Sequence, residues 1–100
     1  MAGPIYKLFM FKPTEAWYQL SPQEQQAIIA ETQGIQRDLG GKTIIECFSG
    51  WSSEQWQYFG VEEYPSIEAV QALTAAHLKL ELYRYTEGMT LLGTEAPTSD

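Results

Sequence analysis

Four short segments of the chain mix aliphatic and aromatic residues with polar ones at the short spacing that β-strands show. They are IYKLFMFK (5–12), TIIECFS (43–49), WQYFGVEEY (56–64) and MTLLGTE (89–95). The first segment ends before Pro13, because a residue that precedes proline is driven to extended geometry. Only the loop GWSSEQ separates the second segment from the third. We therefore expect these two strands to form a hairpin.

Two longer segments between the strands have helical spacing and helix start signals. In SPQEQQAIIAETQGIQRDLGG, Ser21 is placed as the N-cap and Glu24 completes a capping box, while Gly40 and Gly41 stop the helix. The second helical segment is IEAVQALTAAHLKL (67–80), in which apolar residues recur every three or four positions. The sequence thus predicts one helix after the first strand and one after the hairpin.

The resulting order is strand, helix, strand, strand, helix, strand. Two βαβ halves joined by a hairpin are typical of the ferredoxin-like α+β fold, βαββαβ, in which two helices cover one face of a four-stranded antiparallel sheet. The chain is long enough for one domain, which we place at residues 1–95. The small polar tail at 96–100 is expected to be disordered.

The third strand segment raises the question of what covers the second face of the sheet. Alternation separates Phe59 and Val61 from Trp56 and Tyr58. We predict that the first pair lies under the helices and that the second pair lies on the uncovered side. On that side the strands would also present Tyr6, Leu8 and Met10. Such a face is too apolar for water, so a second copy of the chain is expected to cover it as a homodimer.

Several short motifs agree with one known group of proteins. Trp17 follows the first strand, Leu20 comes three residues later, and a capped helix opens with Ser21 and Glu24. The stretches QYFGVEEYPS and YRYTEGMTLLG fit a third strand running into the second helix and an aromatic segment before the last strand. This pattern resembles the dimeric α+β barrel superfamily, in particular darcynin-like and related bacterial groups. Members usually have Phe where this chain has Thr86.

The resemblance implies a fold, an assembly and a place for a ligand. In that superfamily two open sheet faces meet to form a barrel, and each subunit has a ligand pocket between its sheet and its helices. In haem-degrading members a histidine of the second helix ligates iron, and an Asn of the first strand is also used. His77 lies in the second helical segment, but the chain contains no Asn. The resemblance therefore implies a dimer with a pocket, and the missing Asn leaves haem degradation as a minority hypothesis.

Charge and composition exclude several classes of partner. The formal net charge is −7, with only six Lys and Arg residues, so we expect neither a nucleic-acid partner nor an anionic membrane surface. No apolar run is long enough to span a bilayer, and the start has no signal-peptide pattern, which predicts a cytoplasmic protein. The single Cys47 and the single His77 allow no internal disulfide and no four-ligand zinc site. We predict no metal and no cofactor.

Two residues are candidates for acid–base chemistry. His77 falls within the apolar stripe of the second helix, where it could act as a general base or a metal ligand. The alternative is a structural histidine, either in the core with one hydrogen bond or at the edge of the stripe. Glu46 alternates with Ile44 and Phe48, so it would point into the barrel if Ile45 and Cys47 face the helices. Desolvation there would raise the pKa of Glu46. The alternative for Glu46 is a solvent-exposed position on an edge strand.

Aromatic residues with polar tips are the candidates for binding a ligand. These are Trp17, Tyr58, Tyr83 and Tyr85. Tyr83 and Tyr85 are two residues apart, on either side of Arg84, so their side chains would project to the same side of an extended segment. Their hydroxyl groups could orient a planar molecule at a pocket mouth, although aromatic residues also gather at dimer interfaces.

Three functions remain open at this point. The first is a small-molecule binding protein with a pocket between sheet and helices. The second is a cofactor-free oxygenase or isomerase that acts on a small aromatic or polyketide-like compound, which requires a carboxylate or histidine lining a cavity. The third is a purely structural dimer with a filled interior. The sequence leaves open whether the protein is an enzyme.

Overall fold

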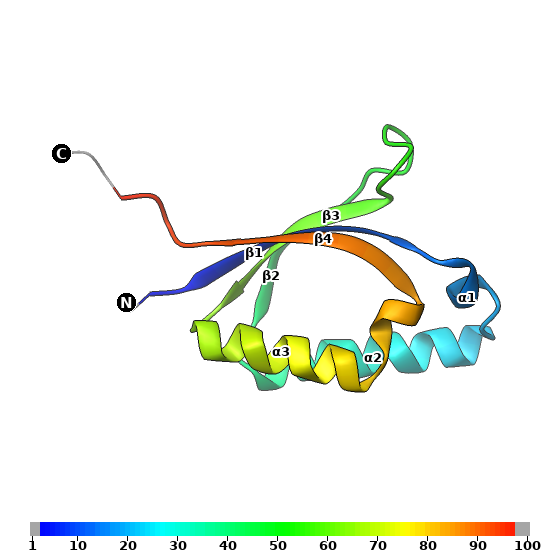
Figure 1. Ribbon diagram of the computed structural model, residues 1–100, viewed down its shortest axis with the longest axis horizontal. Helices are drawn as coiled ribbons and strands as arrows, with labels where there is room; N and C mark the ends of the chain where they lie inside the picture. The colour runs from blue at the N-terminus through cyan, green and yellow to red at the C-terminus, as the bar shows by residue number, and fades with distance from the viewer. Residues whose placement is uncertain (1–2, 98–100) are drawn as a thin grey trace.

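The computed structural model describes residues 3–97 and has the ferredoxin-like α+β architecture that the sequence predicts (Figure 1). Residues 98–100, most of the tail for which we expected disorder, lie outside the described part. The elements in chain order are β1 (Ile5–Pro13), α1 (Glu15–Tyr18), α2 (Pro22–Asp38), β2 (Lys42–Phe48), β3 (Tyr58–Tyr64), α3 (Ile67–Lys79), the 3₁₀ helix η1 (Leu82–Arg84) and β4 (Thr86–Gly93). The short helices α1 and η1 are additions to the predicted set.

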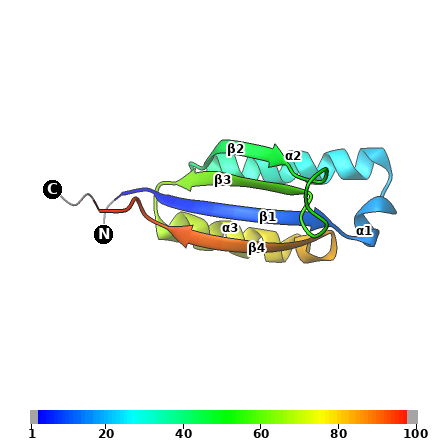
Figure 2. The same ribbon diagram turned by 90° about the horizontal axis from the view of Figure 1, so that it is seen from above.

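The sheet is antiparallel with the strand order β2-β3-β1-β4. Figure 2 shows both long helices behind the same face, with α2 along β2 and β3 and α3 along β1 and β4. In the central pair, Ile5 lies opposite Tyr64 and Phe11 lies opposite Tyr58. This register fixes which side chains of β1 and β3 lie beside each other between the sheet and the helices.

Helix α2 begins and ends where its sequence signals place it. The backbone N–H of Glu24 donates to Oγ of Ser21 at 3.1 Å, and the N–H of Ser21 donates to Oε1 of Glu24 at 2.8 Å, which completes the capping box. At the other end Gly40 has a φ of 78°, a left-handed conformation that residues with a Cβ rarely adopt. The capping residues are therefore enough to determine where this helix begins and ends.

The assignment of the two faces of β3 is the reverse of our prediction. Tyr64 is 1% exposed and packs against Val70 and Leu73 of α3, so its side of the strand faces the helices. Tyr58 has the same parity as Tyr64 and therefore also faces the helices. Phe59 has the opposite parity and lies on the uncovered side. The prediction failed because both faces of this segment are apolar, and alternation alone does not say which of them is covered.

Trp56 lies outside the strand in which we had placed it. Strand β3 begins at Tyr58, and Trp56 belongs to the connection from β2. Its backbone N–H donates to Oγ of Ser53 at 2.9 Å, and its carbonyl oxygen accepts from Oγ of Ser49, also at 2.9 Å. The backbone of Trp56 is thus held in a turn by serine hydroxyl groups. Trp56 therefore does not contribute its side chain to either face of the sheet.

The side of the sheet that faces away from the helices is largely apolar, and we call it the open face. Its apolar members come from all four strands and are Tyr6, Leu8, Met10, Ile45, Cys47, Phe59, Val61, Met89 and Leu91. Two ion pairs, Lys12 with Glu87 and Lys42 with Glu63, lie on the same side. Leu91 is 67% exposed and Met89 is 59% exposed. Neither α2 nor α3 lies on this side (Figure 1). Exposed apolar side chains gathered over four strands are typical of an interaction surface.

The buried core is small and lies at one end of the molecule. Tyr64, Val70 and Leu73 form it, and partly buried residues from the start of β1 and the end of α2 pack around them. Phe9 is the other buried hydrophobic side chain among residues 3–97. The cavity described below is lined by core residues such as Tyr64 and Leu73 and, toward the end where α1 and η1 lie, by Trp17 and Leu82.

Candidate functional site

A cavity of about 570 Å³ lies between the sheet and the helices. That volume falls within the range of roughly 300 to 1,000 Å³ that is usual for small-molecule sites. Strands β1 and β3 line it with aromatic rings, and the rings of Phe11 and Tyr58 are stacked with centroids 5.1 Å apart at 18°. Trp17 of α1 contributes to the same lining. The cavity therefore has a flat aromatic wall.

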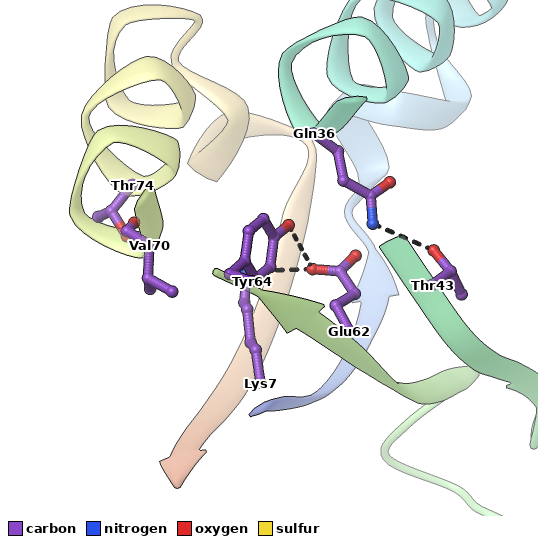
Figure 3. Close-up of polar contacts among 7 residues, drawn as sticks. All are labelled: Lys7, Gln36, Thr43, Glu62, Tyr64, Val70 and Thr74. Atoms are coloured by element: carbon purple, nitrogen blue, oxygen red, sulfur yellow. Dashed lines mark hydrogen bonds and ion pairs between the residues drawn. The ribbon is translucent and has the colours of Figure 1, made fainter. Parts of the chain in front are cut away.

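Ionisable side chains from neighbouring elements line another part of the cavity. Lys7 of β1 lies directly opposite Glu62 of β3, and the Lys7 Nζ is 4.0 Å from Oε1 of Glu62. The Tyr64 hydroxyl donates a hydrogen bond of 2.8 Å to the same Glu62 oxygen. Figure 3 shows these three side chains between the sheet and the helices, joined by dashed lines at Glu62. Tyr64 thereby fixes the carboxylate that faces Lys7.

On the β2 side, the cavity is bounded by a polar contact between helix and strand. Nε2 of Gln36 in α2 donates to Oγ1 of Thr43 in β2 at 3.2 Å, and both residues line the cavity (Figure 3). This contact joins α2 to the edge strand. It gives the cavity neutral hydrogen-bonding groups on the wall away from Lys7.

Burial alters the titration of the groups on the ionisable wall. Desolvation lowers the pKa of Lys7, and the Glu62 carboxylate opposes part of that shift. Burial and the hydrogen bond to Glu62 raise the pKa of Tyr64. Burial, together with the positive charge of Lys7, lowers the pKa of His77 to about 4. At neutral pH, His77 and Tyr64 are therefore neutral.

Glu46 reaches the cavity by a route that alternation did not predict. The pairing of β2 with β3 shifts between Thr43 and Ile45, as at a β-bulge, so that Thr43 and Glu46 both line the cavity. Ile45 and Cys47 lie on the open face and not under the helices. Glu46 consequently faces the helices, and the expected placement inside a barrel is wrong. Partial burial, and then the charge of Glu62, raise the pKa of Glu46.

The four aromatic candidates are divided by the structure. Trp17 and Tyr58 line the cavity. Tyr85 lies next to it and meets the Trp17 ring edge-on, with centroids 6.3 Å apart, whereas Tyr83 is 62% exposed. Leu82–Arg84 form a 3₁₀ helix, so Tyr83 and Tyr85 do not project to the same side as an extended segment would require. The predicted geometry of this tyrosine pair is wrong.

Sequence reasoning found His77 and Glu46, which both line the cavity, but missed the Lys7, Glu62 and Tyr64 cluster. One signal was present, because Lys7 interrupts the apolar segment IYKLFMF at a central position of a strand. Its partner could not be read from the sequence, since the pairing depends on the register between β1 and β3.

Among residues 3–97 there is no cluster of three or more His, Cys, Asp or Glu side chains that could bind a metal ion. The predicted absence of a metal and of a cofactor stays a prediction. In the same part of the chain, no helix has the length and hydrophobicity needed to cross a bilayer.

The pKa of His77 predicts a pH dependence of stability. In the unfolded chain the imidazole takes up a proton as the pH falls below about 6.5, whereas in the folded protein it does so only near pH 4. The unfolded state therefore binds more protons between these values, and the stability contributed by His77 falls as the pH drops from about 6.5 to about 4. Because the imidazole is only partly buried, we expect a loss of roughly 1 to 2 kcal/mol.

Urea denaturation of the wild type and of His77→Gln at several pH values measures this contribution. The difference in unfolding free energy between the two proteins should shrink on acidification through that window. A difference that does not change with pH would mean that the imidazole titrates normally in the folded protein.

Comparison with solved structures finds the same fold in larger proteins. A chlorite dismutase R173K mutant from Candidatus Nitrospira defluvii superimposes with a TM-score of 0.74 at 16% identity, over 97% of this chain and 42% of that one. The same enzyme in complex with imidazole gives a TM-score of 0.74, also at 16% identity and with the same coverage. The chain thus spans less than half the length of these chlorite dismutases.

A smaller neighbour matches over most of both chains. The methylated RPA0582 protein has a TM-score of 0.67 at 17% identity, covering all of this chain and 86% of that one. At 16 and 17% identity these likenesses show the fold alone. No family model and no curated protein sequence matches the chain.

Proposed function

We propose that this protein binds a small, planar organic molecule in the cavity between sheet and helices, as a homodimeric α+β barrel protein of the darcynin-like or a related group. The observation that carries the proposal is the cavity itself, which combines a flat aromatic wall with a separate ionisable wall. Mostly apolar sites with a few oriented polar groups are typical of ligand pockets. Stacking on Tyr58 would position a ring, and the polar groups would select its substituents.

The size of the cavity argues against a purely structural dimer. A purely structural dimer is expected to fill the space between sheet and helices with side chains, whereas about 570 Å³ of it is not filled. Polar lining residues such as Thr32 and Gln36 also favour a solvated or liganded space over a dry void. The lining is therefore better suited to an exchangeable occupant.

The homodimer is proposed from the open face. Its centre carries uncharged side chains such as Leu8, Val61 and Leu91, which can pack against their own copies across a two-fold axis. The Cα radius of gyration is 14.6 Å, above the value of about 13 Å that is usual for a chain of this length. An elongated subunit with one covered sheet face gains most by pairing two open faces.

Glu46 favours the enzymatic alternative, a cofactor-free oxygenase or isomerase acting on a small aromatic or polyketide-like compound. Its carboxylate lines the cavity, and no hydrogen bond or ion pair to it is found within residues 3–97. Desolvation and the charge of Glu62 raise the pKa of Glu46, which is the direction that favours a carboxyl group as a proton donor and acceptor. In that mechanism Glu46→Gln would abolish turnover and leave ligand binding within twofold of the wild type. Loss of binding would instead assign Glu46 to recognition.

The binding proposal predicts that filling the cavity removes the site. Thr32 lines the cavity from α2, whereas its neighbour Glu31 is exposed and lies outside the lining. Thr32→Trp should therefore abolish the binding of planar aromatic ligands, and Glu31→Trp should leave it unchanged. Ligand-detected NMR with a set of flat aromatic compounds measures binding, and circular dichroism confirms that both variants are folded. Equal binding by the two tryptophan variants would place the ligand elsewhere.

A further inference from the structure

The ammonium group of Lys7 is incompletely paired. It has three N–H donors, yet its partner among residues 3–97 is the Glu62 carboxylate at 4.0 Å, a distance too long for a hydrogen bond. The Lys7 side chain is only 15% exposed, and the residue lines the cavity. Its donors are therefore removed from bulk solvent but open to the cavity. An oxygen atom of a bound molecule would satisfy them.

His77 faces the same space from α3. Both residues line the cavity, and the charge of Lys7 is close enough to act on the imidazole. A neutral imidazole has one N–H donor. Strand β1 and helix α3 thus supply an ammonium group and an imidazole to one part of the cavity. The aromatic wall with Phe11 and Tyr58 borders the same cavity.

We propose that Lys7 and His77 bind the carboxylate of a planar organic acid whose conjugated system lies against Phe11 and Tyr58. The inference rests on the proposed ligand cavity and adds the chemical class of its occupant. A carboxylate can accept hydrogen bonds from both nitrogen atoms, and charge-assisted bonds are stronger than those to a neutral carbonyl. Lys7 would then bridge the ligand carboxylate and Glu62.

The other charges of the cavity are compatible with an anion at this place. Its titratable lining residues are Lys7, Glu46, Tyr58, Glu62, Tyr64 and His77, while α2 and β4 contribute neutral Thr32, Gln33, Gln36, Thr86 and Thr90. Glu62 is already engaged by Lys7 and by the Tyr64 hydroxyl. Glu46 lies on β2, two strands from β1, which is roughly 10 Å at the usual strand spacing. Lys7 would lie between the bound carboxylate and Glu62, so its positive charge is the nearest one and offsets the repulsion between the two anions.

Binding of an anion beside His77 should be coupled to proton uptake. The carboxylate would favour the imidazolium form and raise the pKa of His77 from about 4. The affinity for the acid should then increase as the pH falls through the pKa of the complex. His77 is the only histidine in the chain, so its imidazole gives a single, assigned set of NMR signals.

The test compares cinnamate with its neutral amide by isothermal titration calorimetry. Cinnamate should bind the wild type at least about tenfold more tightly than cinnamamide, as expected for a hydrogen bond to a charged group. Lys7→Met should remove this preference, while Lys7→Arg should retain part of it. Lys12→Met is the matched control, because Lys12 is on the same strand, lies outside the cavity lining and pairs with Glu87 at 3.8 Å.

A second measurement does not depend on the folding of a variant. Cinnamate added to the wild type should raise the pKa of His77, followed through the imidazole ¹³C and ¹⁵N shifts, and cinnamamide should not. Equal affinity for acid and amide, or a His77 pKa that does not respond, overturns the carboxylate assignment and leaves the cavity proposal standing. Failure of both compounds and of other flat aromatic ligands to bind overturns the cavity proposal as well.

Discussion

Replacing Leu91 by Glu is expected to convert a dimer into a monomer. Leu91 is 67% exposed at the open face and lies opposite Leu8 of β1. In an isologous interface each substitution occurs twice, and an unpaired carboxylate buried there costs several kcal/mol. We therefore expect the dissociation constant to rise at least about 100-fold. Light scattering at micromolar concentration should give twice the chain mass for the wild type and the chain mass for Leu91→Glu.

The control for this experiment is Leu78→Glu. Leu78 is 61% exposed on α3 and belongs neither to the open face nor to the cavity lining. This variant should remain dimeric. A monomeric wild type would refute the proposed pairing of open faces, and dissociation of both variants would show that the effect is not specific to the face.

Gly60→Val is expected to have the largest effect on stability. Gly60 is buried in β3, and an added Cβ would meet the carbonyl oxygen of Ile45 and the Cζ atom of Phe9, the latter at 2.7 Å. The Ile45 oxygen belongs to the backbone of the neighbouring strand and cannot move without breaking the β2 and β3 pairing. We expect a loss of about 3 kcal/mol in unfolding free energy, measured by urea denaturation.

Gly93→Val serves as the comparison, since a Cβ at that position meets no atom within 4 Å. Its unfolding free energy should stay within about 0.5 kcal/mol of the wild type. If Gly60→Val left the unfolding free energy equally unchanged, β2 would not pack closely on β3 at this position. The placement of Glu46 beside the cavity would then be contradicted.

The parts of the fold with local sequence signals could be predicted. The Ser21 and Glu24 capping box and the Gly40 stop act through nearby backbone atoms, so the bounds of α2 follow from the sequence alone. The element order, and with it the ferredoxin-like fold, follows from the strand and helix periodicities. These signals need no knowledge of which surfaces meet.

Features that depend on packing between distant segments were predicted wrongly or not predicted at all. Alternation groups Tyr58 with Tyr64, but only the contact of Tyr64 with α3 shows that this side is covered. The shift in pairing between Thr43 and Ile45 changes which face of the sheet the following β2 side chains point to. Strict alternation along the sequence does not predict this change. The 3₁₀ turn at Leu82–Arg84 follows Glu81, whose φ of 56° is unusual for a residue other than glycine.

The candidate site shows the same division. His77, Glu46, Tyr58 and Trp17 stood out because of their own chemistry, and all four line the cavity, while their roles stay predictions. The cluster around Glu62 requires the register that places Lys7 opposite it and the hydrogen bond from Tyr64. A buried lysine in an apolar strand indicates a functional or paired position, but its partner is defined only by the folded sheet.

Intermolecular NOEs between a bound planar ligand and the protein test the central claim most directly. With cinnamate present in excess, we expect NOEs from its aromatic and vinyl protons to the rings of Trp17, Tyr58 and His77, which line the cavity from α1, β3 and α3. NOEs to Phe59 and Leu91 instead would place the ligand on the open face and contradict the proposed site between sheet and helices.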